Sequence, residues 1–255
     1  AVYGKSMYDV DKLIDVADLG ITRFTQIIAM CKSENNKVYI LDSSSRIVIL
    51  DNQYNLVGEI GLINGSIAYD NAKGIYYNDG VIYVCDSENA QILMINQAGE
   101  LLDTITLPES NLIPEDFHFK PTKITRDKDG YMYVVSDGCY YGALLYSPER
   151  KFLGFYGANQ VNATLSSVLT NIWNRMFQNA EKHANSIKKL PYALVDITVD
   201  EDGFVFTSNG FTDLSTDARK AMIRRLSPGT GDNILKPGGV FGDVSEDKAG
   251  QKVAI

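Results

Sequence analysis

Residues 37–50 read KVYILDSSSRIVIL: an apolar run, an aspartate, a short polar stretch and a second apolar run. The same arrangement recurs three more times, most loosely in its last copy. The copies are VIYVCDSENAQILMI at 81–95, YMYVVSDGCYYGALLY at 131–146, and FVFTSNGF at 204–211 with MIRRLS at 222–227. An aromatic residue holds the same place in each copy, at intervals of 44, 50 and 73 residues: Tyr39, Tyr83, Tyr133 and Phe206. A period of about 40–50 residues is typical of the blades of a β-propeller.

Each repeat divides into four short strands. The second strand carries the aromatic residue, and the first strands are predicted at 25–30, 73–77, 122–126 and 194–199. The turns between the first and second strands read SENN, YNDG, DKDG and DEDG. Their Asn, Asp and Gly residues readily take the positive φ that tight hairpins need. Four antiparallel strands joined in this way form one propeller blade.

The second and third strands are apolar on both faces. Runs such as VIYVC, YMYVV and ILMI lack the alternation of apolar and polar residues that a strand with one wet face shows. Blades stacked face to face around a ring cover both faces of each sheet. The sequence therefore predicts an all-β propeller of four-stranded antiparallel blades. The blades are expected at 22–60, 70–107, 119–157 and 192–235.

Two stretches depart from the repeat. Residues 160–189 carry apolar side chains at three- and four-residue steps, which predicts a helical insertion that packs on the propeller or forms a lid or docking surface. The last residues, GQKVAI at 250–255, resemble the start of another first strand. We therefore expect about four blades that belong to a six-bladed ring, with a closed four-bladed ring as the alternative. The expected domains are a lead-in segment at 1–21 and a truncated propeller over 22–255 that contains the insertion.

Composition narrows the possible partners. The net charge of −8 argues against a broad nucleic-acid-binding face, because Lys and Arg contacts to phosphates dominate that affinity. No apolar stretch approaches the roughly 20 residues of a membrane-spanning helix. The three cysteines show no Cys-x-x-Cys spacing, and Cys85 stands where other repeats have Leu41 and Val135. Cys85 is therefore expected to be a small buried hydrophobe.

Two repeats resemble the NHL repeat. The segments are DSENAQILMINQAGELLDTI at 86–105 and DSSSRIVILDNQYNLVGEI at 42–60. The marks of that family are the Asp-Ser-x-Asn-x-x-Ile start and the Asx-x-x-Gly hairpin before the fourth strand. The resemblance covers about 22–255, where it implies a truncated NHL-type propeller, and is weaker in the other two repeats. It implies a propeller that binds a protein, a glycan or RNA, as most members of the family do.

A subgroup of Firmicutes NHL-repeat proteins is similar in a further respect. Residues 154–177, GFYGANQVNATLSSVLTNIWNRMF, and 190–207, LPYALVDITVDEDGFVFT, look like its helical insertion between blades. Members tend to be longer, with a secretion or membrane-anchoring segment before the propeller. The resemblance thus implies a bacterial protein that is extracellular or membrane-anchored through a segment outside this stretch. A cytoplasmic location stays open, since low cysteine use suits that compartment equally.

The sequence contains no recognisable catalytic motif. There is no Gly-x-Ser-x-Gly elbow, no His-Glu-x-x-His and no phosphate-binding loop. His118 and His183 are isolated, and the DKDG and DEDG stretches lack the further oxygen ligands of a calcium loop. These stretches are therefore interpreted as hairpin turns. We expect no catalytic residue, no cofactor and no metal.

An enzyme remains the alternative. Gluconolactonase-like lactonases form a neighbouring propeller family, and they hold one divalent cation in the central channel with Glu, Asn and Asp side chains. This sequence offers Asp196, Asp79 and Glu34 near strand ends, but in no motif that matches that family. A metal-dependent lactonase or related hydrolase is kept as the second hypothesis.

The favoured hypothesis is a non-catalytic binding or scaffold propeller for a protein, peptide or glycan ligand. Propellers bind through loops at one end of the channel, and the turns between second and third strands recur at one end. These turns are Ser43–Ser45, Ser87–Asn89, Asp137–Tyr141 and Ser208–Asp213. The predicted ligand-binding residues are Asp137, Tyr140, Tyr141, Ser87, Asn89 and Ser43. Aromatic rings beside a carboxylate suit sugar or peptide recognition, although the two tyrosines could equally cap their blade.

Overall fold

The strands follow the predicted four-strand units. The computed structural model describes residues 12–61, 69, 71–157, 193–209, 223–228 and 234–235. The first sheet contains β1 (Ile27–Lys32), β2 (Val38–Asp42), β3 (Arg46–Leu50) and β4 (Leu56–Gly61). The second contains β5 (Ala72–Asn78), β6 (Val81–Asp86), β7 (Gln91–Ile95) and β8 (Leu101–Thr106). The third contains β9 (Pro121–Arg126), β10 (Met132–Ser136), β11 (Gly142–Tyr146) and β12 (Phe152–Gly157). The described part of the fourth contains β13 (Leu194–Val199), β14 (Val205–Asn209) and β15 (Ile223–Leu226).

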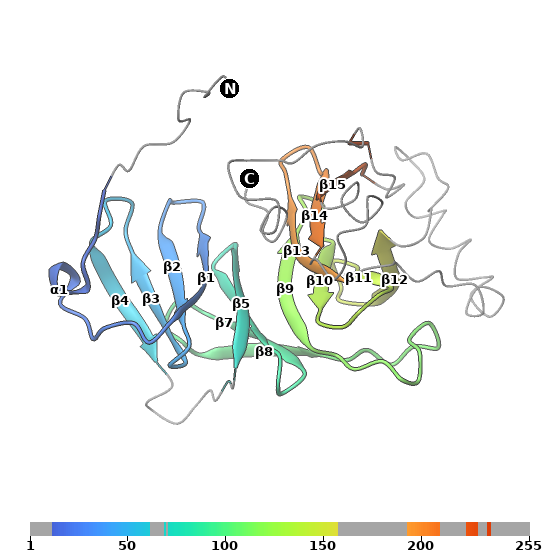
Figure 1. Cartoon of the computed structure of the whole chain (residues 1–255), viewed down its shortest axis with the longest axis horizontal. Coiled ribbons are helices and arrows are strands. Elements are labelled where there is room, and N and C mark those ends of the chain that lie inside the picture. Colours follow the sequence, from blue (N-terminus) through green and yellow to red (C-terminus); the bar gives the residue numbers. More distant parts are fainter. Residues whose placement is uncertain are drawn as a thin grey trace, which may run out of the picture.

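The four sheets are the blades of a propeller. Strands that are adjacent in a sheet are also adjacent in the sequence, and they pair antiparallel. The first strands of successive sheets contact one another, β1 with β5, β5 with β9, and β9 with β13. Figure 1 shows the sheets following one another along an arc, with the first sheet at the left and the fourth at the upper right. The predicted all-β propeller with four blades is confirmed.

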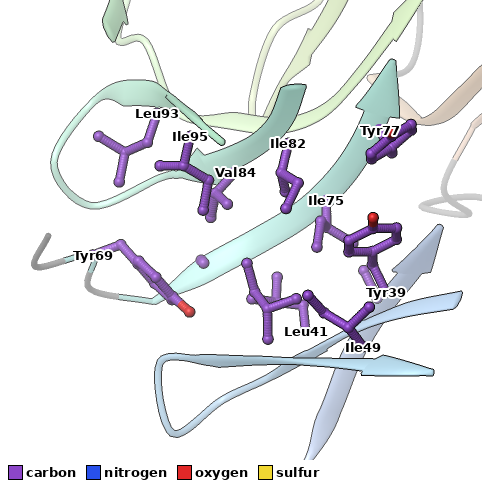
Figure 2. Packing of buried hydrophobic residues seen from close by; sticks show 13 residues of the cluster. Tyr39, Leu41, Ile49, Tyr69, Ile75, Tyr77, Ile82, Val84, Leu93 and Ile95 are labelled. Carbon is purple, nitrogen blue, oxygen red and sulfur yellow. The ribbon is translucent and has the colours of Figure 1, made fainter. Parts of the chain in front are cut away.

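Consecutive residues of a second strand face different blades. Tyr39 and Leu41 of β2 lie in the core between the first two sheets (Figure 2). Ile40, between them in sequence, lies on the opposite face in a separate cluster. In β6, Tyr83 and Cys85 belong to the next core, between the second and third sheets. The absence of a polar alternation in these strands follows, because both of their faces are covered.

The repeated aromatic position is buried in three of the four blades. Tyr39 is 0 % exposed, Tyr83 3 % and Tyr133 7 %. Its place in the repeat predicts that Phe206 is largely buried between sheets as well, and this is wrong, since Phe206 is only half-buried. The register places Phe206 on the face of β14 that points away from the third sheet. No described sheet covers that face, and the Arg225 guanidinium lies 5.6 Å from the ring centroid.

The hairpins between first and second strands have the predicted backbone. Residues of all four turns adopt positive φ: Asn36, Asp79, Gly80, Gly130 and Gly203. In the DKDG turn, Asp127 Oδ1 accepts hydrogen bonds from the backbone N–H groups of Asp129 and Tyr131. In the DEDG turn, Asp200 Oδ1 accepts from Phe204 N–H. Both stretches are hairpin turns, as interpreted from the sequence.

One short helix lies in the lead-in segment, where none was predicted. Helix α1 (Val16–Leu19) begins at Asp15, whose side chain accepts from Ala17 N–H, and ends at Gly20 in the left-handed conformation. Figure 1 shows α1 beside the first sheet. The predicted helical insertion at 160–189 and the predicted strand at 250–255 lie outside the described residues. In the described ranges, helices long and apolar enough to cross a membrane are absent.

Removal of a repeated aromatic side chain tests the blade-to-blade core. Tyr83→Ala should lower the free energy of unfolding by about 3–5 kcal/mol, the range for truncating a buried aromatic residue. Tyr54→Ala is the matched control, because Tyr54 lies at the β3–β4 turn and is 39 % exposed. Urea unfolding of both variants measures the difference. A loss below about 1 kcal/mol for Tyr83→Ala would show that the repeat does not place this residue in a core.

A close approach between the second and third blades depends on a glycine. A Cβ atom built on Gly74 of β5 would lie 2.2 Å from the carbonyl oxygen of Thr122 in β9. The clash is with backbone, which cannot move aside as a side chain can. Gly74→Ala should therefore cost about 3 kcal/mol, the upper end of the usual range for overpacking. Gly58→Ala in β4 meets no atom within 4 Å and serves as the control in the same urea titration. Equal midpoints for the two variants would contradict this close packing.

Candidate functional site

The turns between second and third strands lie at one end of the propeller. Because successive strands are antiparallel, these turns share an end with the connections between blades. We call this end the loop end. Its described parts include the β2–β3 turn, the β6–β7 turn, the β10–β11 turn, the β8–β9 connection and the residues that close β14. Most of the predicted fourth turn, from 210 onward, lies outside the described residues.

A buried polar residue closes each second strand at the loop end. These four residues hold equivalent register positions: Asp42, Asp86, Ser136 and Asn209. Asp42 Oδ1 accepts hydrogen bonds from Thr25 N–H at 3.1 Å and Gln26 N–H at 2.9 Å. Its Oδ2 accepts from Ser44 Oγ at 2.8 Å and pairs with Arg46 Nε at 3.1 Å. Asp42 thus fastens the chain that enters β1 to the turn that leaves β2.

Two of the predicted ligand-binding residues are engaged in the same kind of network. Asn89 Nδ2 and Gln91 Nε2 each donate to Asp86 Oδ2 at 2.8 Å. The buried hydroxyl of Ser87 donates to the backbone carbonyl of Pro121, at the start of β9. Ser87 therefore links the second blade to the third. Both side chains have structural partners, which the binding prediction for this turn did not anticipate.

Two other predicted residues present their side chains to solvent. Ser43 and Asp137 are both exposed. Their backbones are fixed by hydrogen bonds, because Ser43 N–H donates to Gln26 O and Asp137 N–H donates to Lys120 O. Ser136 beside Asp137 is buried, and its Oγ accepts from Lys120 N–H at 2.8 Å. The Asp137 carboxylate thus projects from a turn whose backbone is fixed.

The two adjacent tyrosines have different environments. Tyr141 is half-buried, and its ring lies 5.2 Å from that of Phe155. Phe155 is also 5.7 Å from Phe117, so Tyr141 joins an aromatic cluster under the β8–β9 connection. Tyr140 is 42 % exposed and lies outside the apolar clusters of the described residues. Tyr141 caps the blade, whereas Tyr140 is the ring available at the surface.

The side chain before the tyrosine pair is not a reactive group. Cys139 is buried, and its Sγ lies 3.2 Å from the carbonyl oxygen of Gly142. Burial raises the pKa of this thiol to about 11, so the thiolate is scarce at neutral pH. Cys85 is also fully buried and, as predicted, packs as a small hydrophobe.

The carboxylates of the lactonase hypothesis do not converge. Glu34 Oε1 accepts from Asp79 N–H at 3.1 Å, which places both residues in turns at the end opposite the loop end. Asp196 is buried in β13 and pairs in register with Ser208, next to the loop end. Clusters of three or more His, Cys, Asp or Glu side chains that could bind a metal are absent from the described part of the chain.

Of the two histidines, the structure describes His118 alone. His118 is exposed, and its backbone carbonyl lies 3.5 Å from Ser136 Oγ. His183 lies outside the described residues.

The buried aspartates at the strand ends could have been recognised from the sequence. An Asp-Ser pair directly after an apolar run of four or five residues occurs in two repeats. A carboxylate so close to a core is fully satisfied when nearby backbone N–H groups and an Arg or Gln donate to it. The partner across the turn, Arg46 or Gln91, is the last polar residue before the next apolar run.

Comparison with known proteins identifies the fold alone. No protein-family model matches the sequence, and no curated protein matches it. Among solved structures, the chain is similar to hydrazine synthase of Kuenenia stuttgartiensis, at 12 % identity over 86 % of this chain, with a TM-score of 0.50. It is also similar to a protein of unknown function from Bacteroides caccae, at 11 % identity over 82 % of this chain, with a TM-score of 0.52. The chain spans 51 % of the first of these proteins and 65 % of the second. Identity at this level extends to architecture and not to activity.

The acid dependence of stability tests the Asp42 network. Burial by itself raises the pKa of Asp42, but hydrogen bonds from Gln26, Ser44, Thr25 and Arg46 outweigh it and lower the pKa to about 2. A carboxylate with a depressed pKa contributes stability above its unfolded pKa, and that contribution is lost as the pH falls toward the folded value. The difference in unfolding free energy between wild type and Asp42→Asn should therefore be largest near pH 6 and shrink between about pH 5 and pH 2. A difference that stays constant over this range in urea titrations would contradict the network.

Proposed function

We propose that this protein is a non-catalytic binding or scaffold propeller that recognises a protein, peptide or glycan ligand at its loop end. The observation that carries the proposal is the β10–β11 turn. There an exposed ring, Tyr140, stands three residues from an exposed carboxylate, Asp137. An aromatic face beside a hydrogen-bond acceptor suits a sugar ring or an extended peptide.

Backbone hydrogen bonds hold the turn in place, which favours recognition. Asp137 N–H is held by Lys120 O, Cys139 N–H by Ser136 O, and Tyr141 is held by Phe155. A side chain on a fixed backbone loses little conformational entropy when a ligand binds. Ser43 presents a further hydroxyl at the same end of the first blade. Ser87 and Asn89 support the loops through their hydrogen bonds to Pro121 and Asp86.

We also propose that the blades are of the NHL type and that the protein acts outside the cell or at its surface. What supports the first point is that the Asp-Ser motif of two repeats provides the buried, hydrogen-bonded aspartates Asp42 and Asp86. The second point rests on the resemblance of residues 154–177 to the bacterial subgroup with a helical insertion. Immunodetection of the native protein in surface, membrane and cytosolic fractions tests the location. Recovery in the cytosol alone would refute it.

Binding to glycan and peptide arrays tests the proposed function. Tyr140→Ala should weaken binding by about 10-fold or more, since a well-placed aromatic contact contributes more than 1 kcal/mol, while the unfolding midpoint stays unchanged. Tyr141→Ala should instead lower the midpoint, because it removes a ring from the aromatic cluster. Tyr54→Ala, with nearly the same exposure at the other end of its blade, should alter neither.

The enzyme alternative gives a different result in a simple assay. Lactone hydrolysis that requires added Ca²⁺ or Zn²⁺ and disappears in Asp196→Asn would replace the binding hypothesis with a lactonase. If wild type and Tyr140→Ala bind the arrays equally, the proposal that the ligand binds at the loop end is wrong, although the fold is unaffected.

A further inference from the structure

The outer face of the first blade lacks the cover that the other blades have. In β5, β9 and β13, one isoleucine in the same register position is buried against the preceding blade: Ile75, Ile124 and Ile197. The equivalent residue of β1 is Met30, which pairs with Ile40. Met30 is 62 % exposed. Among the described residues, no blade covers this face of the first sheet.

The chain that leads into β1 covers part of that face. We call residues 12–26 the strap. Its apolar side chains pack against the outer cluster of the first sheet: Leu19, Ile21 and Phe24 against Ile40, Val48 and Leu50. The three sheet residues are thereby buried although no described sheet lies over them. Figure 1 shows the strap crossing the outside of the first sheet.

A polar latch fastens the strap beside this apolar contact. Arg46 Nη2 donates to the backbone carbonyl of Thr22 at 2.7 Å, and its guanidinium lies 5.2 Å from the centroid of the Phe24 ring. The same arginine pairs with Asp42 and with Glu59. Asp42 accepts from the backbone N–H groups at positions 25 and 26. Strap and blade are thus joined by one arginine and one aspartate that belong to the blade.

We propose that the strap is a separable cap over the outer face of the first blade and that it prevents this face from associating with a second copy of this chain. This inference does not depend on the proposed function. An apolar sheet face without cover is a site of aggregation or pairing, and the strap shields the part of this face that lies beyond β1.

The test compares two aspartate substitutions within the strap. Ile21→Asp places a charge in the contact with the sheet, whereas Leu13→Asp changes a side chain that is 89 % exposed. Hydrogen exchange of the full chain is followed at the amides of Thr25 and Gln26, which are protected only while they donate to Asp42. Ile21→Asp should accelerate their exchange by about 10-fold or more through local opening, and Leu13→Asp should leave it unchanged.

Exposure of the outer face gives the second readout. Ile21→Asp should raise the fluorescence of a dye that binds apolar surfaces. Its molecular mass, measured by light scattering, should increase with protein concentration, and its circular dichroism spectrum should remain that of a β-protein. Arg46→Lys keeps the charge but loses the planar fork, and it should give a smaller change of the same sign.

Three outcomes would overturn the proposal. Strap amides that remain protected in Ile21→Asp would show that the apolar contact does not hold the strap. Strap opening without dye binding or self-association would show that it does not cap the face. Loss of the sheet signal in Ile21→Asp would show that the strap belongs to the folding core and is not a separable cap.

Discussion

The packing of one apolar sheet face against the next is the interaction on which this structure depends. Each second strand provides two sets of side chains, one that faces the preceding blade and one that faces the following blade. Each sheet therefore has two apolar faces, and each face is buried only where a neighbouring blade or another segment packs against it. The alternation of Tyr39 and Ile40 between different clusters shows this directly. Burial of apolar area is the main favourable term in folding, and here it acts between blades as much as within them. A blade of this kind would expose both faces if it stood alone.

Polar contacts then fix the geometry that apolar burial leaves open. Apolar faces can slide, but the hydrogen bonds of Asp42 and Asp86 join specific atoms at the loop end of each blade. Buried carboxylates are tolerated because each is surrounded by donors, and an unpartnered one would be costly. Ser87 extends the same principle across a blade boundary through Pro121. These residues align the turns, and so they limit which turn residues remain available for a ligand.

These hydrogen bonds decide which turn residues have a structural role and which are exposed to solvent. At the β6–β7 turn, Ser87 and Asn89 are taken up by structure, whereas at the β10–β11 turn Asp137 and Tyr140 face solvent. The third repeat has Ser136 where the second has Asp86, so its network is smaller and its carboxylate lies one position later, at the surface. Because of this difference of one position, Asp86 is a buried, hydrogen-bonded carboxylate, whereas Asp137 lies on the proposed binding surface.

The sequence alone determined the architecture, because its period, its strands without polar alternation and its Asn, Asp and Gly turns are local signals that agree with one another. Strand positions, hairpin backbones and the burial of Tyr39, Tyr83 and Tyr133 were all predictable in this way. The tertiary structure decided which polar residues are free to act. Tyr140 and Tyr141 are the same residue type side by side, and only the position of Phe155 on another strand assigns one to the core and the other to solvent. Likewise, nothing in the local sequence marks the strap as a cover for Ile40, since that contact joins side chains about twenty residues apart through the folded sheet. The local sequence specifies the strands and turns, whereas the exposure of a side chain depends on which residues, distant in the sequence, pack beside it in the folded protein.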